Sequence, residues 1–123
     1  MSDKPVAERL QVKADHRLAV IGASAALDKL VGAANARTDA ATADAALLFV
    51  ADRGALDKAL PALLKKLPRT AILWLAYPKL TSPLAGDLSR DVIHALAPSH
   101  GLDTVSQIAI NADWSALRLK RVL

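Results

Sequence analysis

The most regular feature of the chain is a set of three short apolar runs, each followed by a polar residue, a glycine turn or a proline. The runs cover residues 17–22, 45–51 and 70–77, and Pro78 follows the last one. A short continuous run of Leu, Ile, Val and Ala is typical of a strand that is buried on both faces of a sheet. These segments therefore predict the parallel centre of an α/β sheet.

Apolar residues recur at helical spacing before and after the first run. A short lead-in helix is expected within residues 1–13, where apolar side chains share one face. After the run, Leu27 and Val31 lie on one face of a helix that Ser24 caps and that ends near Gly32. A strand, a glycine turn and a helix in this order open a βαβ unit.

Two further helices are expected after the second and third runs. Asp52 should cap the first of them, and Pro61 should kink or break it because proline lacks a backbone donor. Asp87 should cap the second, which ends by Pro98 with Gly101 as its terminator.

The last part of the chain alternates apolar and polar residues. Residues 104–110 and 115–122 have this pattern around a polar turn at 111–113, which predicts an antiparallel hairpin. A weakly signalled strand at 36–38 brings the expected strands to six, and adjacency and handedness rules give the order 2-1-3-4-6-5. We therefore expect residues 1–123 to form one α/β domain, a Rossmann-like three-layer open sheet, mostly parallel, with a C-terminal antiparallel hairpin.

Composition and charge narrow the chemistry. Cysteine is absent, which excludes disulfides and thiol nucleophiles and fits a reducing cytoplasm. The net charge is +4, and residues 61–123 carry eight basic and four acidic side chains. This excess is milder than the dense basic stripe of a nucleic-acid-binding surface. Charged residues precede the first apolar run and no run is long enough to span a bilayer, so we expect a cytoplasmic protein without membrane contact.

Several short motifs occur together at a characteristic spacing. They are Leu47–Asp52, Pro78–Lys79, Asp87, Gly101–Leu102 and Trp114–Leu119. The set is similar to a family of small bacterial proteins of unknown function. Over about residues 5–122 the chain resembles a class I methyltransferase fold that has been shortened. The resemblance implies the fold and carries no established activity.

Class I methyltransferases bind S-adenosylmethionine against a glycine-rich turn after the first strand and an acidic residue after the second. The resemblance, with the rule that ligands lie over the C-terminal ends of strands, implies a cofactor-binding set at matching positions. Its members are Gly22, Ala23, Ser24, Asp39, Asp52, Arg53, Pro78 and Lys79. The departure from the pattern is the turn itself, which has one glycine where close approach of a cofactor usually requires more.

The turn at Ser24 also approximates the G-x-S-x-G elbow of serine hydrolases. A nucleophilic serine needs a histidine within hydrogen-bond reach. His16 precedes the first strand, and His94 and His100 lie on or after the last helix, so the sequence favours Ser24 as a helix N-cap. No catalytic set and no metal-ligand spacing is identified.

Three functions remain open. The first is a non-enzymatic binding or interaction module, with a partner protein or a second copy of the chain. The second is an enzyme or sensor that binds S-adenosylmethionine or a nucleotide at the strand ends. The third, which the mild charge disfavours, is nucleic-acid binding. Its candidate residues are Lys65, Lys66, Arg69, Arg118, Lys120 and Arg121. Arg118 and Lys120 share one strand face, where they form an anion-binding patch or discourage edge aggregation.

Overall fold

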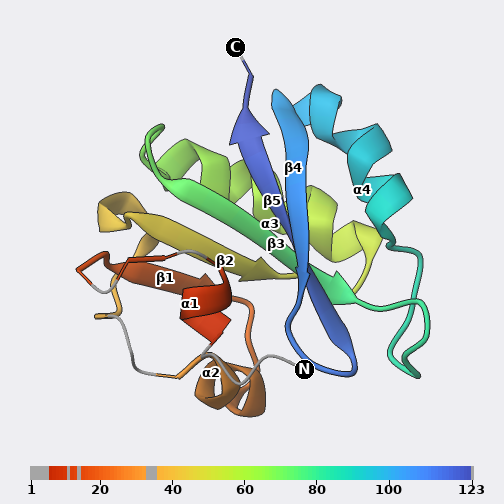
Figure 1. Cartoon of the computed structure of the whole chain (residues 1–123). Helices are drawn as coiled ribbons and strands as arrows, with labels where there is room; N and C mark the ends of the chain where they lie inside the picture. Colours follow the sequence, from red (N-terminus) through yellow and green to blue (C-terminus); the bar gives the residue numbers. More distant parts are fainter. Residues whose placement is uncertain (1–5, 11, 14, 33–35, 123) are drawn as a thin grey trace.

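The computed structural model describes residues 6–10, 12, 13, 15–32 and 36–122, and its strands form one five-stranded sheet (Figure 1). The strands are β1 (Leu18–Ile21), β2 (Ala45–Phe49), β3 (Ile72–Pro78), β4 (Leu102–Ala109) and β5 (Trp114–Arg121). The α-helices are α1 (Val6–Arg9), α2 (Ala25–Val31), α3 (Arg53–Lys66) and α4 (Arg90–Leu96), and the 3-10 helices are η1 (Ala40–Thr42) and η2 (Ala97–His100).

The strand order is β1-β2-β3-β5-β4. The first three strands are parallel, and β5 is antiparallel to both β3 and β4. The α/β fold class, the parallel centre and the C-terminal hairpin are therefore confirmed. The lead-in helix expected within residues 1–13 is described as α1, while residues 1–5 and 11 lie outside the described part of the chain.

The sheet differs from the prediction at residues 36–38, which were expected to form a full strand beside β1. They form a single parallel bridge, between Arg37 and Leu18. The side chain of Asp39 then accepts a hydrogen bond from the backbone N–H of Thr42 and so starts η1 directly after the bridge. Because this cap turns the chain at once, the pairing cannot extend along β1.

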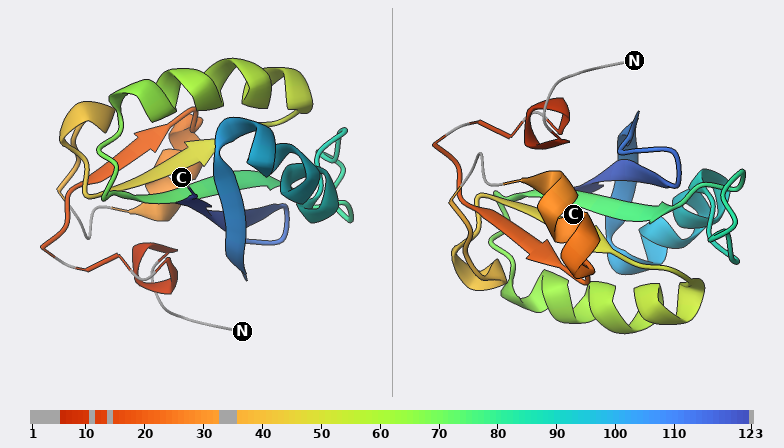
Figure 2. Two further views of the ribbon diagram at one scale, coloured as in Figure 1. Left: turned by 90° about the horizontal axis from the view of Figure 1, so that it is seen from above. Right: turned by 90° about the horizontal axis from the view of Figure 1, so that it is seen from below.

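The central strands separate two apolar layers. On one face, Leu48 and Leu75 pack against residues of α3 and α4. On the other face, Leu47 and Trp74 pack against residues of α1 and α2. Figure 2 shows α3 and α1 on opposite sides of the sheet. Adjacent residues of one strand point to opposite faces, so burial on both sides requires the continuous apolar runs of the sequence.

The N-terminal segment is tied to distant parts of the chain. The indole Nε1 of Trp74 donates a hydrogen bond to the carbonyl oxygen of Leu10 at 3.0 Å. The guanidinium of Arg9 donates to the carbonyl oxygens of Ala109 and Ile110, at 2.6 and 3.0 Å. These bonds hold the segment that carries α1 against both β3 and the C-terminal hairpin.

Two predicted helix caps are confirmed, one is corrected, and the expectation at Pro61 is narrowed. Ser24 and Asp52 each accept a backbone N–H in the first turn of α2 and α3. Of the two outcomes expected at Pro61, a kink or a break, the break does not occur, since α3 runs through Pro61 with buried leucines on both sides. The N-cap of α4 is Ser89 rather than Asp87. The carboxylate of Asp87 instead accepts the backbone N–H of Arg53, at 2.8 Å.

The turn after β1 depends on Gly22. Its φ is +78°, and a Cβ atom at this position would lie 2.5 Å from the carbonyl oxygen of Phe49. A side chain is therefore excluded both by backbone conformation and by the neighbouring strand. The close approach of β1 and β2 explains why residue 22 is a glycine, and no bound ligand is needed to explain it.

Replacing Gly22 by Ala is expected to lower the free energy of unfolding by about 3 kcal/mol or more, since strain and steric clash add. The control is Gly101→Ala, at a φ of +71° with no atom within 4 Å of the added Cβ. This control should lose only about 1 kcal/mol. Urea unfolding of both variants measures the difference, and equal losses would contradict the proposed clash with Phe49.

Candidate functional site

The structure brings seven of the eight predicted cofactor-binding residues to one edge of the sheet. This edge is formed by the C-terminal ends of the parallel strands. The residues that lie there are Gly22, Ala23, Ser24, Asp52, Arg53, Pro78 and Lys79. It is the edge at which open α/β sheets bind ligands.

Asp39 lies at the opposite end of the sheet. Its carboxylate accepts hydrogen bonds from the backbone and the hydroxyl of Thr42, at 3.3 and 3.1 Å. Thr42 stands just before the start of β2, and the bridge at Arg37 pairs with the first residue of β1. The structure therefore does not bring Asp39 together with Gly22, and its carboxylate caps η1.

The remaining polar members of the set hold the turns in place. The Ser24 hydroxyl accepts the backbone N–H of Leu27 at 3.2 Å. The Asp52 carboxylate accepts the backbone N–H of Ala55 at 2.8 Å. The guanidinium of Arg53 lies 3.8 Å from the carboxylate of Asp57. Each of these polar groups thus has a partner within its own helix start.

A groove of about 600 Å³ lies at the C-terminal ends of β1 and β2. Its lining residues are Ile21, Gly22, Leu48, Phe49, Val50, Ala51, Ala55, Lys58 and Ala59. Lys58 is the single lining side chain with a polar atom, so the groove supplies no carboxylate for ribose hydroxyls. Asp39 lies at the far end of the sheet, and no lining residue of this groove carries a carboxylate in its place.

The loop after β3 is fastened over the ligand edge by the hairpin turn. The backbone N–H of Lys79 donates to the carbonyl oxygen of Asp113 at 2.7 Å. The buried Ser82 hydroxyl donates to the Asp113 carboxylate at 2.8 Å and accepts the backbone N–H of Leu84 at 3.0 Å. These bonds fix the loop as one wall of a second groove.

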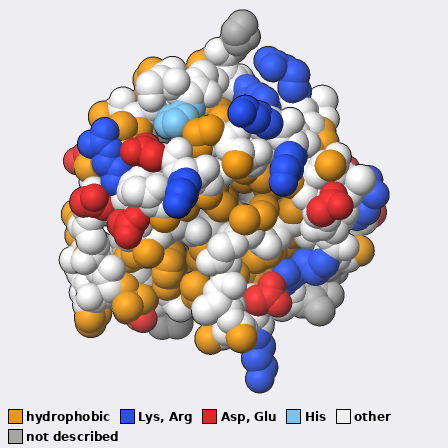
Figure 3. Space-filling model, turned by 180° about the vertical axis from the view of Figure 1, so that it is seen from behind, with side chains coloured by type: hydrophobic (Ala, Val, Ile, Leu, Met, Phe, Trp, Pro, Cys, Tyr) orange, Lys and Arg blue, Asp and Glu red, His pale blue; other side chains and the backbone are white. Residues whose placement is uncertain are grey.

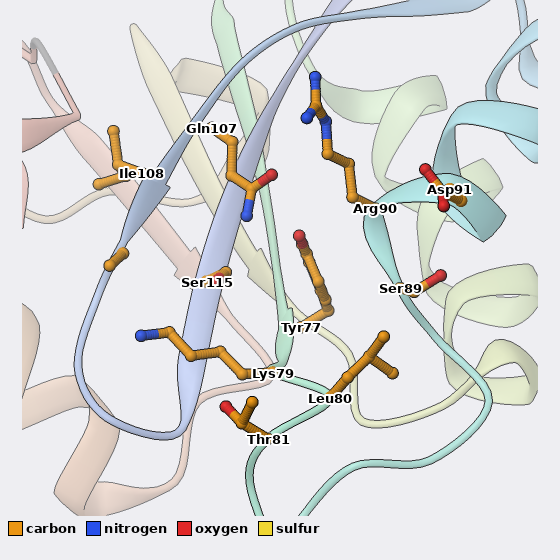
Figure 4. A pocket seen from close by; sticks show the side chains of 11 residues that line it. Tyr77, Lys79, Leu80, Thr81, Ser89, Arg90, Asp91, Gln107, Ile108 and Ser115 are labelled. Atoms are coloured by element: carbon orange, nitrogen blue, oxygen red, sulfur yellow. The ribbon is translucent and has the colours of Figure 1, made fainter.

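This second groove, the hairpin groove, has a volume of about 730 Å³ and is drawn in Figure 4. Its walls are the loop after β3 and the start of α4, and the hairpin and Tyr77 form its floor. The lining residues are Tyr77, Lys79, Leu80, Thr81, Ser89, Arg90, Asp91, Gln107, Ile108, Ala109 and Ser115. Of the predicted set, only Lys79 is among them.

Two cations border the hairpin groove. Lys79 follows β3 and Arg90 begins α4, and neither belongs to an ion pair found among the described residues. Between them the Tyr77 side chain points into the groove with its hydroxyl outermost (Figure 4). Arg90 was not predicted from the sequence. A basic residue in the first turn of a helix is unfavourable, because it lies at the positive end of the helix dipole. Its presence there is a signal that could have pointed to a function.

The electrostatics of the groove act on Tyr77. Burial raises the pKa of the Tyr77 phenol above its usual value, and the Asp91 carboxylate acts in the same direction. The Arg90 guanidinium and a hydrogen bond with Ser115 lower the pKa and offset part of this rise. At neutral pH the phenol is therefore protonated and offers a hydrogen-bond donor to the groove.

Comparison with known proteins now places the chain. Residues 19–122 match a family described as "Protein of unknown function (DUF3052)". The chain belongs to this family. The expected membership of an unknown-function family is thereby confirmed. No curated protein matches this DUF3052 chain.

Solved methyltransferase structures share the fold at low sequence identity. The mitomycin 7-O-methyltransferase MmcR matches with a TM-score of 0.66 and 11% identity, over 88% of this chain and 49% of its own. The DUF3052 chain thus spans about half the length of that enzyme. The 1,6-didemethyltoxoflavin-N1-methyltransferase of Burkholderia thailandensis matches with a TM-score of 0.61 and 9% identity, over 96% of this chain and 75% of its own.

A third match covers nearly all of both chains. The N-methyltransferase NodS from Bradyrhizobium japonicum WM9 has a TM-score of 0.55 and 17% identity, over 94% of this chain and 92% of its own. Identities this low show the fold alone. They confirm the methyltransferase-like Rossmann fold.

Two further features concern the described part of this DUF3052 chain only. None of its helices combines the length and the apolar character that crossing a bilayer requires. Its His, Asp and Glu side chains form no group of three or more that would ligate a metal ion.

Replacing Ser82 by Ala should release the loop from the hairpin turn, since the hydroxyl makes two hydrogen bonds there. The loss is expected to be about 1–2 kcal/mol of local stability. Faster hydrogen exchange of the Leu84 amide measures it. The exposed neighbour Thr81, changed to Ala, is the control, and unchanged exchange in Ser82→Ala would show that the loop is held by other contacts.

Tyr77 is the only tyrosine, so its ionisation can be followed by ultraviolet absorbance in the intact protein. The midpoint is expected above the usual value of 10.0. Because the unfolded chain loses this proton first, the free energy of unfolding should fall as the pH rises between the unfolded and folded pKa values. Arg90→Gln removes a cation that lowers the pKa and should raise the midpoint further. A native midpoint at or below 10.0 would be inconsistent with a buried phenol.

Proposed function

We propose that this protein is a binding module that holds an anionic group, a carboxylate or a phosphate, in the hairpin groove. The supporting observation is that Lys79 and Arg90, from two different elements, border one groove and make no ion pair with a described residue. Two unpaired cations on a concave surface attract an anion, and charge-assisted hydrogen bonds then fix it.

The rest of the lining suits a small molecule with an acidic group and an apolar part. Tyr77, Gln107 and Ser115 place hydrogen-bonding atoms on the groove floor. Leu80 is 67% exposed on the loop wall and offers apolar contact at the rim. Most of the lining side chains are polar, and the apolar ones are Leu80, Ile108 and Ala109. This mixture suits a small polar ligand that hydrogen-bonds to the groove.

The proposal is one of binding without turnover. The groove lining contains one carboxylate, Asp91, and no histidine. General acid–base catalysis usually needs two groups of matched pKa near the reacting atoms. Asp39, one of the eight residues of the predicted cofactor-binding set, also lies away from the other seven. A binding role requires neither feature and uses the two cations that are present.

Amide chemical-shift titrations with citrate and with inorganic phosphate test the proposal, at constant ionic strength in potassium chloride. Saturable shifts are expected at Lys79, Thr81, Arg90 and Gln107. Replacing Lys79 or Arg90 by Gln should weaken binding about tenfold, since each removes one charge-assisted hydrogen bond.

Lys29→Gln is the control, because Lys29 is an exposed residue of α2 that does not line the groove. The control should bind as the wild type does. A parallel titration with S-adenosylmethionine examines the alternative function. Shifts confined to residues 22–24, with none around Arg90 for any anion, would overturn the proposal in favour of a cofactor site.

A further inference from the structure

A third groove, of about 410 Å³, lies where β3 begins, at the opposite end of the sheet from the hairpin groove. We call it the basic groove. Its lining residues are Leu67, Arg69, Thr70, Ala71, Ile72, Leu73, Val105, Arg118, Leu119, Lys120 and Arg121. Four of them are basic and none is acidic. It holds twice the cationic side chains of the hairpin groove in a smaller volume.

The topology explains why the cations meet. The pairing of β3 with β5 ends at Leu73 and Leu119, and β5 continues past this pair to Arg121. Arg69 enters from the turn between α3 and β3, beside this overhang. Seen from behind, Lys and Arg side chains gather at the end of the molecule where β5 ends (Figure 3).

Arg121 is held in place by the protein. Its Nη2 donates to the carbonyl oxygens of Leu64 and Leu67, at 3.1 and 2.9 Å, at the C-terminal end of α3. These carbonyls are the ones that a helix leaves without intrahelical partners. The other guanidinium nitrogens have no hydrogen-bond partner among the described residues. The side chain is therefore held in place, and its remaining N–H groups can donate hydrogen bonds to a ligand.

The other three cations of the groove are Arg69, Arg118 and Lys120. None of Arg69, Arg118 and Lys120 belongs to an ion pair among the described residues. Asp103 faces Lys120 across β4 and β5 and offsets part of its charge, but it forms no ion pair with Lys120 and does not line the groove. Like charges that share a groove repel one another, and this repulsion is relieved when a multiply charged anion binds.

We infer that the basic groove is a binding site for a diphosphate group, either free or carried by a nucleotide. Two adjacent phosphates present oxygen atoms over a span that three or four cations can contact at once, and guanidinium groups pair with them in a bidentate manner. The exposed Val105 and buried Leu67 give an apolar wall for an organic substituent.

Single-stranded nucleic acid fits the groove less well than a compact diphosphate. Binding of single strands relies on aromatic side chains that stack with bases. The four aromatic residues of the chain are all buried, and none of them lines this groove. Only the cationic side chains remain to recognise a ligand. They favour a compact anion that carries several charges over a single strand of nucleic acid.

The test is an amide chemical-shift titration of the whole chain with sodium pyrophosphate, ADP, inorganic phosphate and adenosine, in potassium chloride at fixed ionic strength. Pyrophosphate should give saturable shifts at Thr70, Ala71 and residues 118–121. Its affinity should exceed that of phosphate by at least about tenfold. Tighter binding of ADP than of pyrophosphate would assign the diphosphate to a nucleotide, and the reverse would assign it to the free anion.

The double variant Arg118→Gln with Lys120→Gln should weaken pyrophosphate binding by about tenfold or more. The matched control is Lys65→Gln with Lys66→Gln, which removes the same charge from exposed positions of α3 outside the groove. It should change affinity less than about twofold. Lys29→Gln, which lies outside both grooves, should bind pyrophosphate as the wild type does. The affinity is read from the shifts of residues 118–121, so that binding in the basic groove is measured separately from binding in the hairpin groove.

Three results would overturn the inference. The first is an absence of saturable shifts at millimolar pyrophosphate. The second is that the control pair weakens pyrophosphate binding as much as the Arg118 and Lys120 double variant does. Binding would then depend on the overall positive charge and not on this groove. The third is a single-stranded oligonucleotide that occupies these residues and is not displaced by pyrophosphate. Circular dichroism of each variant establishes that the fold is retained.

Discussion

The whole structure depends on two strands that are buried on both faces. All five residues of β2 are buried, and in β3 only Ile72 is partly exposed. Such strands have no place for a polar side chain, because a buried polar group without a partner costs several kcal/mol. Every residue with useful chemistry is therefore displaced to the ends of the sheet. The three grooves lie at these ends, or beside the hairpin that extends the sheet.

The path of the segment between α2 and β2 determines which acidic residue reaches which end of the sheet. In place of a second strand the segment makes one bridge at Arg37, and Asp39 then turns the chain into η1. The acidic residue that the fold resemblance places at the ligand edge thus stays at the far end. At the ligand edge itself, Asp87 and Asp113 join the loop after β3 to its neighbours. The fold is methyltransferase-like, and the polar side chains described at its ligand edge hold turns and loops in place.

Much of the fold follows from patterns that are local in sequence. The apolar runs identified the central strands, and Ser24 and Asp52 capped helices as expected, because an N-cap is decided within a single turn. The segment at 36–38 and the cap of α4 were not predictable in this way. Asp87 and Ser89 are both good capping residues, and the choice between them is made by Arg53 from another part of the chain. The hairpin groove was missed for the same reason, since Gln107 and Arg90 meet only in three dimensions.

The bonds between Arg9 and the hairpin join residues that are about one hundred positions apart in sequence. Contacts between residues so far apart in sequence form slowly, because the entropy cost of closing the long loop must be met before the contact stabilises the chain. During synthesis on the ribosome, the face of the sheet that carries Trp74 cannot be sealed until the hairpin at residues 102–121 has emerged. In the interval between the synthesis of β3 and that of the hairpin, a nascent chain of this protein therefore presents an apolar surface of the kind that chaperones bind.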